Sequence, residues 1–150
     1  MRHFRRFVLT AVALAAVACR PEPQQFALRL DTDSYSFRVT ADPLPPRARE
    51  QTKYTVVVSD RETKQPIEGG EGRIFASNAG PDDPDRRTVW DGLAAAEQVG
   101  TYTANMSFVT AGNWAMALEF RRDSASRLER VDWRQDIRPE APAFPGDTGQ

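Results

Sequence analysis

The chain has 150 residues, with 20 Lys and Arg against 21 Asp and Glu, and its formal net charge is −1. Charges of both signs are mixed along the chain and form no basic stripe, so we expect no nucleic-acid partner. The only His, His3, and the only Cys, Cys19, both lie near the start. A Ser–His triad or a Cys–His pair is therefore not available to the rest of the chain, and we expect a protein that is not an enzyme and needs no cofactor.

Residues 1–18 are predicted to be a secretory signal peptide. Arg2, Arg5 and Arg6 form a basic leader, and an apolar run without charge follows from Phe7 to Val17. This run is far shorter than the ~20 residues of a membrane-spanning helix. We therefore expect export from the cytoplasm, with cleavage between Ala18 and Cys19.

The junction Ala16-Val17-Ala18-Cys19 resembles the lipobox of bacterial lipoproteins, with Ala16 where Leu is the commonest residue. The resemblance implies a lipid on Cys19, and two or more acyl chains, at ~0.8 kcal/mol per buried methylene, anchor a protein stably. The alternative is general signal peptidase cleavage after Ala18, which would leave a free thiol in an oxidising compartment. By the same resemblance, Arg20 after the cysteine favours the outer membrane of the cell envelope, facing the periplasm.

The organisation behind the leader is predicted from composition. Residues 19–25 are expected to form the acylated Cys19 and a flexible tether, and residues 139–150 (PEAPAFPGDTGQ) a disordered, Pro/Gly-rich tail. Residues 26–138 are expected to form one domain, because a mature chain of ~130 residues can bury a proper core.

Apolar and polar residues alternate with period two through this domain, which predicts half-buried β-strands. In chain order the alternating runs are residues 26–30, 35–39, 54–58, 74–76, 88–90, 102–108, 114–120 and 131–137. About seven strands at this spacing predict an all-β, immunoglobulin-like antiparallel β-sandwich.

The sequences between these runs predict a turn, a loop and a short helix. Ala111-Gly112-Asn113 predicts a tight hairpin turn between two long strands. Residues 80–85 (GPDDPD) predict a loop. Residues 91–98 (DGLAAAEQ) are the only segment expected to be helical, with one or two turns capped by Asp91 and ended by Gly100.

The segment VGTYTANMSFVTAGNWAMALEF, residues 99–120, resembles the C-terminal half of YtkA-like and FixH-like domains. The shared features are Gly100 and Tyr102 on one strand, an apolar strand ending near Ala111-Gly112, and Trp114 opening the next strand. The similarity covers roughly residues 36–139 and implies an immunoglobulin-like fold. Tyr102 and Trp114 are expected to be core residues.

Several relatives in that family work around copper proteins or terminal oxidase assembly, so the resemblance raises the question of a metal. The Met and His residues that suspected metal-binding relatives place at the strand matching residues 73–78 are absent here. Soft ions need thiolate, thioether or imidazole ligands, and Met106 and Met116 are in phase with core residues. Calcium at Asp82, Asp83 and Asp85, or at Asp31 and Asp33, lacks the spacing of an EF-hand loop. We expect no metal site.

Two functions stay open. The first is an accessory lipoprotein, held at the membrane by Cys19, that docks on another envelope protein such as an oxidase or efflux assembly. The second is a carbohydrate- or surface-binding module. Saccharide sites present solvent-facing aromatic rings, so Trp90 discriminates between the two: exposure beside Tyr54 or Trp133 on a flat face would favour the saccharide.

Overall fold

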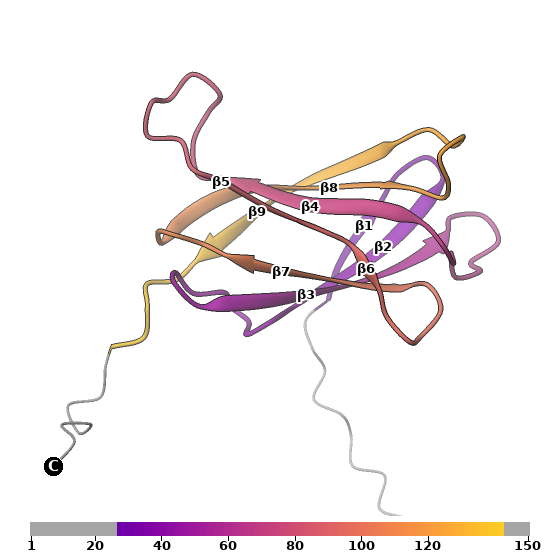
Figure 1. The fold of residues 1–150 in the computed structure, drawn as a ribbon, viewed down its shortest axis with the longest axis horizontal. Helices are drawn as coiled ribbons and strands as arrows, with labels where there is room; N and C mark the ends of the chain where they lie inside the picture. Colours follow the sequence, from indigo (N-terminus) through magenta and orange to yellow (C-terminus); the bar gives the residue numbers. More distant parts are fainter. Residues whose placement is uncertain (1–26, 143–150) are drawn as a thin grey trace, which may run out of the picture.

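The computed structural model describes residues 27–142 and consists of two antiparallel β-sheets packed face to face (Figure 1). One sheet has the strand order β1-β2-β3-β7-β6 and the other the order β5-β4-β8-β9. The strands are β1 (Leu28–Asp31), β2 (Tyr35–Asp42), β3 (Gln51–Asp60), β4 (Glu71–Ser77), β5 (Thr88–Gly92), β6 (Ala94–Ala95), β7 (Thr101–Ser107), β8 (Gly112–Arg121) and β9 (Glu129–Ile137). The predicted all-β antiparallel sandwich is confirmed, and every predicted strand is present.

The core lies between the sheets because the alternating apolar residues of both sheets point toward each other. Tyr102 and Trp114 are both buried, as predicted. Phe120 contacts the rings of Tyr35, Phe37 and Tyr102, with centroid distances of 5.2–6.0 Å. These edge-on contacts join β2 and β7 of one sheet to β8 of the other.

The predicted hairpin at Ala111–Asn113 is wrong. β7 pairs with β3 and β6, whereas β8 pairs with β4 and β9, so the connection crosses from one sheet to the other. The alternation of β7 and β8 is the same whether two strands pair side by side or face each other across the core. In this crossing, the indole Nε1 of Trp114 donates a hydrogen bond to the Thr110 carbonyl at 3.1 Å.

The helix predicted over residues 91–98 is also wrong. Asp91 and Gly92 end β5, and Ala94–Ala95 form β6, which pairs with Tyr102 and Thr103 of β7. A helix of two turns is marginal by itself, and the side of β7 that does not pair with β3 offers these alanines hydrogen bonds instead. Gly100 does not end a helix but has a φ of +75° in the turn before β7.

Residues 88–95 therefore form one extended segment that belongs to both sheets. β5 pairs with β4, and β6 pairs with β7. At the change-over, the Leu93 amide donates to the Gly72 carbonyl at 2.9 Å. Nearby, a carboxylate oxygen of Asp91 accepts from the Asn105 amide of β7 at 2.7 Å. We call residues 88–95 the switch segment.

The ends of the domain also bear on the predicted boundaries. Residues 139–142 are described and contain no strand. Glu140 lies 3.5 Å from Arg49 as an exposed ion pair. Residues 1–26 and 143–150, which include the predicted leader, the tether and most of the predicted tail, lie outside the described residues.

Two buried tyrosines differ in how their hydroxyl groups are satisfied. The Tyr102 hydroxyl donates to the Ile67 carbonyl at 2.7 Å and accepts from the Gly70 amide at 3.0 Å. The Tyr54 hydroxyl is buried and has no hydrogen-bond partner among residues 27–142. Burial raises the pKa of Tyr54, so this side chain stays a neutral phenol.

We expect Tyr54→Phe to leave the free energy of unfolding unchanged or to raise it slightly, because it removes an unpaired buried hydroxyl. Tyr102→Phe should lower it by about 1–3 kcal/mol, because the Ile67 carbonyl and the Gly70 amide then lose their partner. Urea denaturation of the two variants measures the difference. Equal losses in both would mean that the Tyr54 hydroxyl does have a partner.

Candidate functional site

The sequence-predicted site residues fall in different places. Cys19 and Ala18, the predicted lipid-attachment and cleavage residues, lie outside the described residues. Trp90 lies on the outer face of the β5-β4-β8-β9 sheet and is 68% exposed. Tyr54 is 1% exposed and Trp133 packs against the core, so neither lies beside Trp90. These three aromatic residues therefore do not form a flat platform.

The outer face around Trp90 is organised as rows of side chains that run across the strands. The registers of β4, β8 and β9 define three such rows: Ser77–Ala115–Arg134, Phe75–Ala117–Asp132 and Arg73–Glu119–Arg130. Trp90 of β5 extends the middle row, because it is the register partner of Phe75. Side chains in such rows lie side by side on one face of the sheet.

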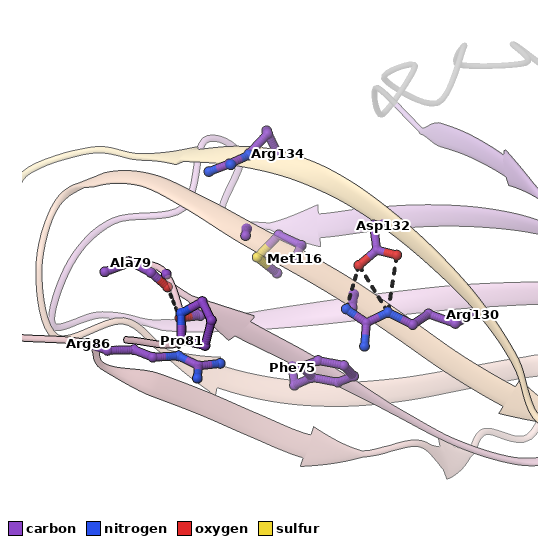
Figure 2. Close-up of a pocket in the computed structure, with 12 residues that line it drawn as sticks. Phe75, Ala79, Pro81, Arg86, Met116, Arg130, Asp132 and Arg134 are labelled. Carbon is purple, nitrogen blue, oxygen red and sulfur yellow. Dashed lines mark hydrogen bonds and ion pairs between the residues drawn. The ribbon is translucent and has the colours of Figure 1, made fainter. Parts of the chain in front are cut away.

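Two of these rows have an alanine at their centre, and this leaves a hollow in the face. Ala115 and Ala117 of β8 form its floor, and larger side chains of β4 and β9 stand on either side. Gly80 and Pro81 of the loop between β4 and β5 also line it. Its volume is about 300 Å³. Figure 2 shows Arg86 and Arg134 at opposite sides of this hollow, which we call the Ala115 hollow.

The third row closes one end of the Ala115 hollow with an ionic network. Nε of Arg73 donates to Glu119 at 2.8 Å, and Arg130 donates to Asp132 at 2.6 Å and lies 3.7 Å from Glu119. The guanidinium groups of Arg73 and Arg130 lie over the Phe75 ring, 5.5 Å and 4.8 Å from its centroid. The hydrogen bonds that Arg130 donates to Asp132 raise the pKa of Arg130. In this row the positive charges have carboxylate partners.

The first row is different, because Arg134 in this row and Arg86 of the β4–β5 loop beside it have no carboxylate partner in the described part of the chain. Nε of Arg86 donates to the Ser77 hydroxyl at 2.9 Å, and the Ser77 hydroxyl donates in turn to the Ala79 carbonyl at 2.8 Å. Arg134 donates to the Asn113 side-chain oxygen at 3.4 Å. Neither guanidinium forms an ion pair within residues 27–142. The Ala115 hollow thus has a small apolar floor between two charged donors, which suits binding.

The thioether side chains that could bind copper are buried. Met106 and Met116 are both at most 2% exposed and belong to the core cluster. No group of three or more His, Cys, Asp and Glu side chains lies close enough together to hold a metal ion within the described part of the chain. Asp83, one of the candidate calcium ligands, instead accepts the Asp85 amide at 2.8 Å inside its own loop.

A soluble fragment from Pro21 to Pro139 should not bind Cu(I) with high affinity. It lacks His3 and Cys19, and both of its thioethers are packed as core residues. A competition titration against a Cu(I) chelator measures this affinity. Stoichiometric binding tighter than about micromolar would contradict it, because carboxylates and amides offer Cu(I) no soft ligand.

The Ala115 hollow is a feature that the sequence analysis did not identify. Its signal was present in the small residues Ala115 and Ala117 on the polar side of an otherwise bulky strand, followed by alternating charges on β9. The strand order was missing, however. Only the pairing of β8 with β4 and β9 brings Arg86 and Arg134 to the two sides of one alanine.

Comparison with known proteins bears on the fold alone. No protein-family model and no curated protein matches the chain. A solved DUF4426 family protein from Pseudomonas aeruginosa PAO1 is similar with a TM-score of 0.56 and 10% identity, over 77% of this chain and 97% of that one. A DUF4785 family protein from Legionella pneumophila has a TM-score of 0.44 and 12% identity, over 70% of this chain and 28% of that one.

The first of these structures supports a β-rich fold for the domain. The resemblance to YtkA-like and FixH-like domains stays a prediction, since neither solved structure carries those names. In residues 27–142 no helix is long and apolar enough to cross a membrane.

Proposed function

We propose that this protein is a non-enzymatic lipoprotein of the bacterial cell envelope that docks on a partner protein. The lipid on Cys19 anchors it, and the outer face of the β5-β4-β8-β9 sheet is the docking surface. The observation that supports this surface is the Ala115 hollow, where Arg86 and Arg134 have no carboxylate partner among residues 27–142 and Trp90 beside it is exposed. Tryptophan and arginine are the residues that dominate protein–protein binding energy.

The resemblance to YtkA-like and FixH-like domains supports an accessory role of this kind, near copper proteins, oxidases or efflux assemblies. Met106 and Met116 are buried, so such a role would be indirect, through a partner that holds the metal. A second candidate, a carbohydrate- or surface-binding module, is favoured by the 68% exposure of Trp90. The nearest aromatic residue in its row, Phe75, is covered by two guanidinium groups and offers a sugar little free ring surface.

Photo-crosslinking in living cells tests the docking surface. A benzophenone amino acid is placed at Trp90 in one strain and at Arg38, on the outer face of the other sheet, in a control strain. We expect a discrete crosslinked protein band from position 90 and none from position 38. A band of equal intensity from both positions, or crosslinks only to polysaccharide, would contradict docking through this face.

A further inference from the structure

We propose that the Ala115 hollow is a carboxylate-binding subsite for an extended acidic segment of the partner protein. In it, Arg86 and Arg134 hold one Asp or Glu side chain of the partner from opposite sides. This inference rests on the proposed docking function and adds the chemistry of the partner. The occupant is a peptide carboxylate rather than a phosphate or a sugar acid.

The first support is the placement of the two arginines. Ser77 and Arg134 are the outer members of the row centred on Ala115, so their backbones are two strand spacings, roughly 10 Å, apart. Arg86 is tied to the Ser77 side of this row by its hydrogen bond of 2.9 Å. The Arg86 and Arg134 side chains therefore extend from opposite sides of the Ala115 methyl group. A carboxylate has about four lone-pair sites and can accept from both at once.

The second support is the balance of charge. Arg73, Arg130, Glu119 and Asp132 neutralise one another at the closed end. Around the Ala115 hollow, three arginines face Asp132 as the one carboxylate among the lining residues that the structure describes. Arg86 and Arg134 thus leave two positive charges uncompensated among the described lining residues, and a single carboxylate offsets one of them. A doubly charged phosphate would add repulsion from Asp132.

The third support is the shape of the hollow, which runs along β8. Its floor repeats every second residue, at Ala115 and Ala117, and Arg130, Asp132 and Arg134 repeat in the same way on β9. An extended peptide has the same two-residue repeat of about 6.6 Å. A peptide segment lying along β8 can therefore place an acidic side chain over Ala115. The side chain two residues further along the peptide, on the same face, then lies toward Asp132, where a neutral residue fits best.

Fluorescence anisotropy with the full lipidated chain in neutral detergent provides the test. The probe is a fluorescein-labelled octapeptide of seven Ser residues and one central Glu, and the matched probe has Gln in place of that Glu. We expect the Glu peptide to bind about tenfold more tightly, as charge-assisted hydrogen bonds require. Arg86→Gln and Arg134→Gln should each remove most of this preference. Arg38→Gln, on the opposite sheet, should leave it unchanged.

Ala115→Leu distinguishes binding in the Ala115 hollow from a general electrostatic attraction between the Glu peptide and the arginines. It fills the floor without changing any charge, and it should weaken the Glu peptide about as much as Arg134→Gln does. Thermal melts within about 2 °C of the wild type establish that these variants are folded. Should Ala115→Leu bind as the wild type does, or should the Gln peptide bind equally well, the subsite is refuted. Displacement of the peptide by inorganic phosphate or trigalacturonate at lower concentration than by acetate would also refute it.

Crosslinking from position 90, repeated in an Arg86→Gln, Arg134→Gln background, distinguishes the two proposals. Loss of the crosslinked band together with the Glu preference supports both. A band that persists at full intensity shows that docking stands and that the acidic partner is wrong. If the wild-type protein prefers the Glu peptide but gives no crosslinked band from position 90, the subsite stands and docking on an envelope protein is wrong.

Discussion

Trp114→Ala is expected to lower the free energy of unfolding by about 3–5 kcal/mol, as for other fully buried aromatic residues. Trp114 has no exposed surface, and its ring meets that of Phe108 edge-on at a centroid distance of 5.2 Å. The change leaves a cavity where β8 enters the core, and it frees the Thr110 carbonyl of its hydrogen bond. Domains of this kind have about 5–15 kcal/mol of stability in total, so much of the fold would be lost.

Trp90→Ala is the matched control, because the same side chain is removed from an exposed position on the outer face. It should change the free energy of unfolding by no more than about 0.5 kcal/mol. Urea denaturation measures both variants. If Trp114→Ala were as stable as Trp90→Ala, Trp114 would have to be a surface residue.

The second large effect is expected at Cys19. Cys19→Ser should abolish lipid attachment, so that the protein is found either as uncleaved precursor or in the soluble fraction. The reason is chemical: the thioether that links the lipid to the protein needs the sulfur. Metabolic labelling with a fatty-acid analogue, followed by membrane fractionation, measures both consequences.

The wild type should carry the label and sediment with membranes. The Trp90→Ala variant, which changes the outer face only, should do the same and serves as the control. A wild-type protein without label would show that Cys19 is not the anchor, and that cleavage by the general signal peptidase after Ala18 is the better account.

The strands were predictable because their buried apolar residues recur at every second position, on the face toward the core. The alternation of Tyr102 and Met106, and of Trp114 and Leu118, indicated both the strands and the buried sides. The local alternation of apolar and polar residues does not determine which strands pair with one another. For that reason Ala111–Asn113 was interpreted as a hairpin, although β7 and β8 lie in opposite sheets.

The switch segment was missed for a different physical reason. Its alanines favour a helix when considered alone, but the hydrogen bonds offered by β7 outweigh such a weak preference. The proposed docking surface could not be predicted from local sequence either. Arg86, Ala115 and Arg134 are unremarkable in sequence, and they become a site only through the order of β4, β8 and β9. The anchor, by contrast, was predicted from consecutive residues and does not depend on the fold.

The switch segment also determines how the surface would respond to a pulling force. Trp90 lies on β5, whose chain continues directly into β6, so this exposed residue of the proposed docking surface is tied to both sheets (Figure 1). Tension applied at Trp90 would be shared between the β4 ladder and the shorter β7 ladder. Separating β5 from β4 would also stretch the Asp91–Asn105 hydrogen bond and the hydrogen bonds between β6 and β7. A tethered protein that holds a moving partner would thus distribute the strain through the whole sandwich rather than through one edge strand.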